Sequence, residues 1–198
     1  AQWLKFRDVL ERVELDKKRF PEFNEELAHD MFQECTETFN YIVQSDSSVM
    51  ELLDNKYLFV NDRLAKIYNL KGVKGNNFRK VDINDARRGG LVTSSAMMTM
   101  TSYPLRTSPV LRGNYIISAL LGIPTPPPPE GVEELPEDDS VADGLTVKQR
   151  FEQHRKDPVC FSCHIRMDPM GFPLEVFDPL GRLREKSGGH PIDANGEM

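Results

Sequence analysis

The sequence predicts a mainly α-helical chain of 198 residues in three parts. Apolar residues recur at the spacing of amphipathic helices through residues 1–123, which predicts a helical domain. Prolines and acidic residues crowd residues 124–144, a composition that cannot continue a helix and predicts an extended linker. Residues 145–198 contain two closely spaced cysteines followed by turn residues. We expect this last segment either to stand apart or to pack on the helical domain as one unit.

The longest helix is predicted from Asn24 to Ser45. Asn24 is an N-cap residue, and two glutamates follow it in the first turn, where negative charge favours the helix N-terminus. Its apolar stripe consists of Leu27, Met31, Cys35, Phe39, Ile42 and Val43. The other helices before the linker are predicted at 3–13, 49–53, 61–68, 91–101 and 108–121. One short strand is predicted at 78–83, where polar and apolar residues alternate.

The segment after the linker is predicted to begin with a helix and to end irregularly. Thr146 and Gln149 have the spacing of a capping box, so a helix is expected from there to about Lys156. Beyond residue 167, repeated Asp-Pro pairs and single glycines predict a turn-rich wrap. The stretch 187–191 is predicted to be a loop.

The chemistry of the chain centres on Cys160-Phe161-Ser162-Cys163-His164. Two cysteines three positions apart with a histidine after the second are typical of covalent c-type haem attachment. The thiols of Cys160 and Cys163 add to the two haem vinyl groups, and His164 is then the proximal iron ligand. A structural zinc site would need a fourth ligand, and a thioredoxin-like dithiol would be expected beside a βαβ pattern. Haem c is therefore the favoured cofactor.

The iron ligand opposite His164 is open between several side chains. His154 lies six residues before Cys160, on a helix that a bend at Asp157-Pro158 could bring across the haem edge. Met100 belongs to a methionine cluster, and thioether ligation suits an electron carrier of higher potential. The remaining alternatives are no protein ligand, Met97, Met98, Met170, His190 and His29.

Three further side chains are candidates for holding the haem. Arg155 and Arg112 are expected to pair with the haem propionates through charge-assisted hydrogen bonds. The ordinary alternative for either residue is a solvated surface arginine. Phe172 lies in the apolar part of the turn-rich wrap and is expected to pack against a haem face or edge.

Charge and hydropathy limit the partners. A formal net charge of −6 argues against nucleic acid, because binding to phosphates depends on lysine and arginine. The longest apolar run, 115–123, is too short to span a bilayer. We expect the partner to be a redox protein or another haem domain, within a larger complex. Haem c is attached outside the bacterial cytoplasmic membrane, so we expect a periplasmic or extracytoplasmic location.

Several stretches resemble planctomycete-type cytochrome c-associated domains of unknown function, which belong to exported multidomain haem proteins. The similar stretches are Arg88-Gly89-Gly90-Leu91, residues 59–65, 101–113 and 167–178, the proline tract, and residues 152–155 leading into Cys160. The resemblance implies a fragment that spans three consecutive family domains, the third cut near residues 192–196. Only 34 residues follow His164, which also indicates that upstream helices or a missing segment complete the haem pocket.

The sequence favours single-electron transfer by one covalent haem. The alternatives are a haem enzyme of peroxidase or oxygenase type with an open sixth site, and a structural or binding module of a surface protein. No catalytic residue is predicted, because no distal acid-base pair can be placed.

Overall fold

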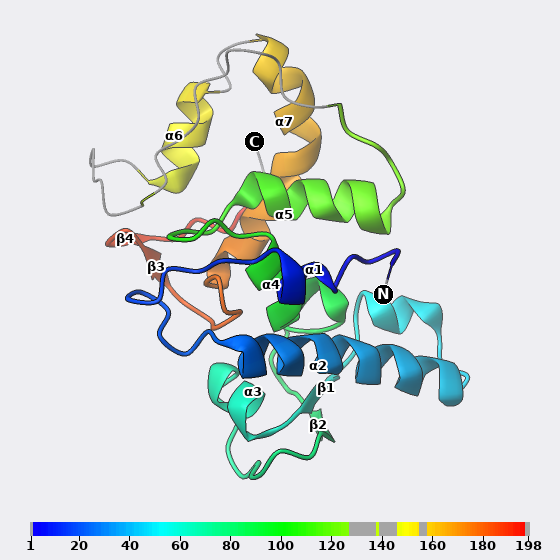
Figure 1. Cartoon of the computed structure of the whole chain (residues 1–198). Helices are drawn as coiled ribbons and strands as arrows, with labels where there is room; N and C mark the ends of the chain where they lie inside the picture. Colours follow the sequence, from blue (N-terminus) through cyan, green and yellow to red (C-terminus); the bar gives the residue numbers. More distant parts are fainter. Residues whose placement is uncertain (1, 127–137, 139–145, 155–157, 197–198) are drawn as a thin grey trace. The chain divides into compact units, whose positions relative to one another are not determined.

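A computed structural model describes residues 2–126, 138, 146–154 and 158–196. The chain forms two compact units (Figure 1). Unit 1 consists of residues 1–100 with 179–182, and unit 2 of residues 101–178 with 183–198. The described residues are mainly helical, which confirms the predicted class. The predicted linker 124–144 lies largely outside the described residues, so the three-part division stays a prediction.

Unit 1 is built on α2 (Glu25–Gln44), against which α1, α3, α4 and β1 pack. The Asn24 side chain accepts a hydrogen bond from the Leu27 backbone N–H at 2.8 Å, so the predicted N-cap is confirmed. The other elements are α1 (Asp8–Glu11), η1 (Val49–Leu52), β1 (Tyr57–Val60), α3 (Asp62–Ile67), β2 (Arg79–Asp82), η2 (Leu91–Thr93) and α4 (Ser95–Met100).

Three details of unit 1 differ from the sequence prediction. The helix expected at 3–13 is reduced to α1, because Lys5 has a left-handed φ of 52° that interrupts it. The apolar stripe of α2 is buried only in part, since Phe39 and Val43 are exposed. The predicted strand is β2, and it pairs antiparallel with β1, which sequence reasoning missed. Nearly all of β1 is buried, so it lacks the alternation that would have revealed it.

Unit 2 contains α5 (Pro109–Tyr115), continued by a π-helical turn, η3 (Ile116–Leu120). The predicted caps are confirmed: the Ser108 hydroxyl accepts from the Leu111 N–H at 3.2 Å, and Thr146 and Gln149 exchange two hydrogen bonds. The remaining elements are α6 (Val147–His154), α7 (Pro158–Gly171), η4 (Phe172–Val176), β3 (Lys186–Ser187) and β4 (His190–Pro191).

The segment after the cysteine motif is more regular than predicted. Helix α7 continues through Pro169 to Gly171, where a turn-rich wrap was expected. The loop predicted at 187–191 contains a small hairpin, in which β3 pairs antiparallel with β4. Gly188 and Gly189 make its turn with φ values of 55° and 84°, which suit the tightest hairpin connections.

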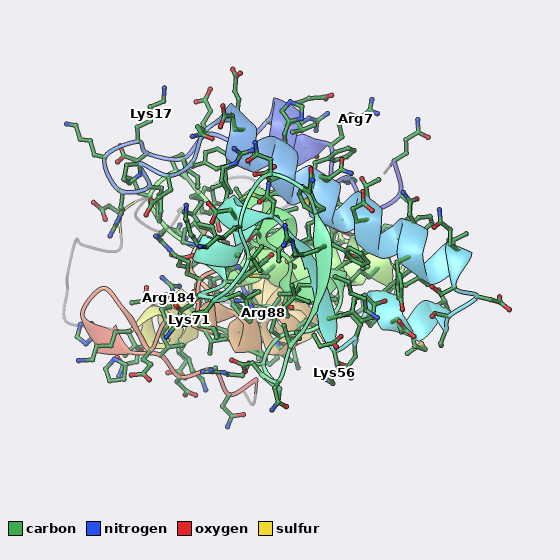
Figure 2. All side chains as sticks on the ribbon, turned by 90° about the horizontal axis from the view of Figure 1, so that it is seen from below. Arg7, Lys17, Lys56, Lys71, Arg88 and Arg184 are labelled. Carbon is green, nitrogen blue, oxygen red and sulfur yellow. The ribbon has the colours of Figure 1, made fainter. Side chains whose placement is uncertain are left out.

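A buried polar group lies in the interior of unit 1. The Tyr68 hydroxyl is 2.7 Å from both carboxyl oxygens of Glu34 and accepts a hydrogen bond from the Ser95 N–H. The guanidinium of Arg88 lies 4.3 Å from the centre of the Tyr68 ring. Arg88 is buried, whereas Lys17 is exposed and lies at the edge of the molecule in the view of Figure 2. Burial raises the pKa of Glu34 to about 7, against the opposing effects of Tyr68 and Arg88.

The segment 179–182 completes this unit through its backbone carbonyls. Ser95 Oγ donates to the Leu180 oxygen at 2.8 Å, and Thr99 Oγ1 donates to the Pro179 oxygen at 2.9 Å. Arg88 Nη2 donates to the Gly181 oxygen at 2.7 Å. Three side chains of one segment thus donate hydrogen bonds to carbonyl oxygens that lie 80 to 93 residues later in the sequence.

Glu34 is expected to make the stability of unit 1 depend on pH. The folded protein keeps the Glu34 proton up to about pH 7, whereas the unfolded chain releases it near its ordinary pKa of 4.5. The free energy of unfolding should therefore fall by about 3 kcal/mol as pH rises through this window, and then level off. Urea unfolding followed by fluorescence of Trp3, the single tryptophan, measures it. Glu34→Gln should abolish the decline and the exposed-site control Glu25→Gln should keep it; a decline retained in Glu34→Gln would contradict the assignment.

Candidate functional site

Helix α7 carries the whole cysteine and histidine motif. Residues three and four positions apart share one face of a helix, so Cys160, Cys163 and His164 lie on neighbouring parts of the same surface. Both cysteines are free thiols of intermediate exposure. His164 is buried. The motif thus combines two reachable sulfurs with one shielded imidazole.

The imidazole of His164 is fixed by a carboxylate on the same helix. His164 Nδ1 lies 2.9 Å from Asp168 Oδ1, one helical turn later, and Asp168 is fully buried. With Asp168 as a carboxylate, which only accepts hydrogen bonds, the shared hydrogen belongs to Nδ1. In a neutral imidazole, Nε2 then carries the lone pair that a metal ion uses.

One aromatic ring packs against His164, and a second packs against the first. The Phe151 ring of α6 has its centre 5.9 Å from the centre of the His164 ring. Phe172, at the start of η4, meets Phe151 edge-on with the two centres 5.7 Å apart. Both phenylalanines are buried. The predicted site residue Phe172 is thereby brought into the group around His164, whereas Phe151 and Asp168 were not predicted.

Helix α5 crosses α7 at very short range. A Cβ atom added at Gly113 would overlap the Met167 carbonyl group, and one added at Gly171 would overlap the Pro109 carbonyl group. The two glycines therefore permit backbone-to-backbone contact at both ends of the crossing. A helix that precedes the predicted linker is in this way packed directly on the helix that carries the motif.

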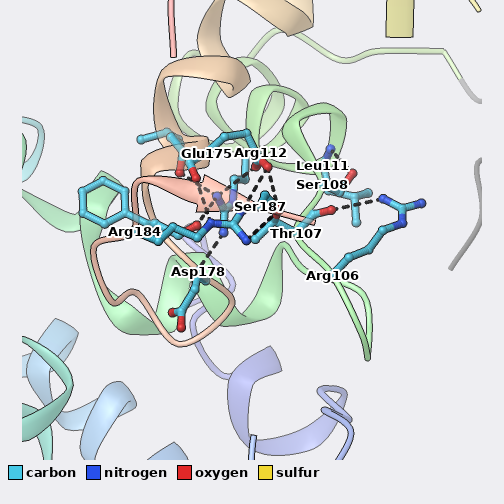
Figure 3. A network of polar contacts seen from close by, with 11 residues as sticks. Arg106, Thr107, Ser108, Leu111, Arg112, Glu175, Asp178, Arg184 and Ser187 are labelled. Atoms are coloured by element: carbon cyan, nitrogen blue, oxygen red, sulfur yellow. Dashed lines mark hydrogen bonds and ion pairs between the residues drawn. The ribbon is translucent and has the colours of Figure 1, made fainter. Parts of the chain in front are cut away.

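A buried polar network fastens the chain around this crossing (Figure 3). Arg112, which is fully buried, donates from Nη1 to Glu175 Oε1 at 3.0 Å and to the Leu174 and Phe177 carbonyl oxygens at 2.6 and 2.9 Å. Thr107 Oγ1 donates to Glu175 Oε2 at 2.6 Å and accepts from Arg184 Nη2 at 2.7 Å. The segment before α5 is thus bonded to the chain that follows α7.

One nitrogen atom of Arg112 takes no part in this hydrogen-bond network. Its Nε is buried and has no hydrogen-bond partner among the described residues. Burial lowers the pKa of Arg112 to about 10, so the side chain still carries its charge at neutral pH. The Nε–H group of Arg112 is thus charged and can still donate a hydrogen bond to an acceptor. Pairing of Arg112 with a haem propionate stays a prediction.

The remaining predicted site residues are Met100, His154 and Arg155, and none of them has a described contact with His164. Met100 is the last residue of α4, half-buried, and belongs to unit 1. His154 is the last residue of α6, but its side chain lies outside the described part of the structure, as does the whole of Arg155. The iron ligand opposite His164 and the role of Arg155 therefore stay predictions.

In the part of the chain that the structure describes, no three or more histidine, cysteine, aspartate or glutamate side chains gather as metal ligands. Nor is any helix among the described residues long and apolar enough to cross a membrane.

A family model, PSCyt3, described as a protein of unknown function (DUF1588), matches residues 88–187, which is half of the chain. The chain belongs to the PSCyt3 family. The PSCyt3 region includes α5 and α7, the Arg112 network and the His164 group. A second model, PSD4, also described as a protein of unknown function (DUF1592), matches residues 1–70. No curated protein and no solved structure matches the chain.

The two family matches can be compared with the resemblance to cytochrome c-associated domains that the sequence predicts. Both support the kind of family that the sequence resembles, the planctomycete cytochrome-associated domains. Two consecutive domains are accounted for, and the third, expected near residues 192–196, stays a prediction.

The α5–α7 crossing of the PSCyt3 region is expected to tolerate no side chain at Gly113. Gly113→Ala should lower the free energy of unfolding by at least about 2 kcal/mol, because overpacking at a tight contact forces the two helix backbones apart. Thermal unfolding followed by far-ultraviolet circular dichroism measures the loss. Gly122→Asn is the control, since nothing lies within 4 Å of a Cβ there and asparagine tolerates its φ of 67°. Equal stability of Gly113→Ala and the wild type would show that the helices do not cross this closely.

Proposed function

We propose that this chain is a c-type cytochrome that transfers single electrons through one covalently bound haem. Cys160 and Cys163 would form the two thioether bonds, and His164 Nε2 would bind the iron. The observation that carries the proposal is the buried His164 imidazole, held at Nδ1 by Asp168, on a helix that also presents two free thiols.

The residues present fit this group. The two sulfurs are in no disulfide and are partly exposed, as addition to haem vinyl groups requires. The Nδ1 of His164 is already engaged by Asp168, which leaves Nε2 as the nitrogen for the metal. Arg112 keeps a buried, unpartnered N–H in the same unit, which suits the negative charge of a propionate.

The bound haem would supply a one-electron couple between its ferric and ferrous states. The chain's own residues hold and shield it. Asp168 orients the imidazole of His164, and the Phe151 and Phe172 rings exclude water from the group around it. Arg112 also keeps the chain after α7 in one conformation, because its guanidinium is bonded to that segment at several points.

We also propose the remaining parts of the site and its setting. His154 or Met100 would be the sixth ligand, and Arg155 would pair with a propionate. Covalent haem attachment implies a periplasmic or extracytoplasmic location, with a redox protein or another haem domain as the electron partner. The net charge of −6 favours a partner with a basic docking surface.

Removal of the two motif cysteines should abolish covalent haem. The wild-type chain, exported in cells that contain the cytochrome c maturation system, should carry one haem that survives denaturing electrophoresis and gives a c-type pyridine haemochrome spectrum. Cys160→Ala/Cys163→Ala should carry none, because no thiol remains near the vinyl groups. Cys35→Ala is the matched control, since Cys35 is buried in unit 1 and should not affect haem content. A wild-type chain without covalent haem would refute the proposal.

Carbon monoxide should distinguish electron transfer from haem enzyme chemistry. The absorption spectrum of the reduced protein should stay unchanged under carbon monoxide, because a protein ligand on the sixth site leaves no place for the gas. Met100→Leu and His154→Ala, made separately, should show which side chain is responsible, since its loss opens the site. Rapid binding of carbon monoxide to the wild type would instead favour an enzyme with an open sixth position.

A further inference from the structure

We propose that Asp168 is the positioning residue of the proximal iron ligand and that its carboxylate biases the haem iron toward the oxidised state. The inference rests on the proposed function, because it takes His164 as the ligand. No comparison assigns a role to Asp168, and it lies outside the Cys160–His164 motif itself.

The geometry of the pair is produced by the helix. His164 and Asp168 are separated by four residues within α7, so their side chains lie one above the other on the same face. The Nδ1 to Oδ1 distance is 2.9 Å, within the range of a charge-assisted hydrogen bond. The Asp168 side chain is fully buried, so water does not compete for its oxygens.

The chemical consequence concerns the charge on the imidazole. A carboxylate that accepts the Nδ1 hydrogen makes the ring a more basic ligand at Nε2. A ferric iron carries one more positive charge than a ferrous iron, so the nearby negative charge stabilises it more. The effect is larger in a buried site, where the effective dielectric constant is low. An amide or a backbone carbonyl in the same place would orient the ring without this charge.

The His164 ring is packed against an aromatic group. The Phe151 ring centre lies 5.9 Å from the His164 ring centre, and Phe172 packs edge-on against Phe151. Contact with the Phe151 ring restricts rotation of the imidazole, which helps to keep Nδ1 directed at Asp168. The carboxylate is thus placed to act on the ligand atom through one short hydrogen bond.

The reduction potential of the haem-loaded protein tests the inference. In Asp168→Asn, which keeps the shape and an oxygen acceptor but removes the charge, the midpoint potential should rise by 59 mV or more, a tenfold change in the ratio of reduced to oxidised protein. Asp168→Glu restores the charge and should return the potential toward the wild-type value. Asp193→Asn removes one negative charge from an exposed residue of the same unit and should leave the potential unchanged.

The outcomes separate this inference from the proposed function. If the wild type holds covalent haem and Asp168→Asn has the wild-type potential, only the inference is overturned. If the wild type holds none, the proposed function fails, and the inference fails with it. If Asp168→Asn does not fold, nuclear magnetic resonance of the reduced, low-spin wild-type protein tests the His164–Asp168 hydrogen bond instead. A slowly exchanging Nδ1 proton on His164 supports the pair, and exchange as fast as for an exposed histidine overturns it.

Discussion

The close crossing of α5 and α7 is the constraint on which unit 2 depends. Glycine at 113 and 171 lets one helix backbone touch the other, and this contact brings the neighbouring Arg112 within reach of the chain that follows α7. A guanidinium suits that place because its planar set of donors can serve several acceptors at once. Buried ion pairs add little net stability compared with apolar packing, so the network with Glu175 acts mainly to select one conformation. His164 and Asp168 are held on a helix whose position is set in this way.

Structural features that depend only on residues close together in the sequence could be predicted. The caps at Asn24, Ser108 and Thr146 form as expected, because each capping side chain bonds to a backbone group three residues away. The cysteine and histidine spacing is also a local pattern, and the haem site that it predicts stays a prediction. Phe172 lies edge-on against Phe151, and its expected packing against a haem stays a prediction.

Features that depend on distant parts of the chain could not be predicted. Helix α7 continues through Pro169, where local propensity predicts a turn, and its packing on α5 offsets the lost backbone hydrogen bond. Arg112 was expected to pair with a haem propionate, with a surface arginine as the alternative. It is buried against Glu175 and carbonyl acceptors that come from more than sixty residues away. Asp168 had a signal that was overlooked, namely an acidic residue one helical turn after a candidate ligand. Phe151 had none, since its partner rings lie in other elements.

The path of the chain through residues 179–182 changes how the protein can be divided. These four residues belong to unit 1, although the chain on either side of them belongs to unit 2. A truncation in the proline-rich stretch would therefore remove the carbonyl oxygens that accept hydrogen bonds from Arg88, Ser95 and Thr99. The buried Arg88 guanidinium would keep the Thr93 carbonyl oxygen as an acceptor and lose that of Gly181. The packing of the first unit therefore uses a segment that follows the cysteine motif in the sequence. The two family matches, residues 1–70 and 88–187, both contribute residues to this unit, so the boundary between them is no boundary of folding.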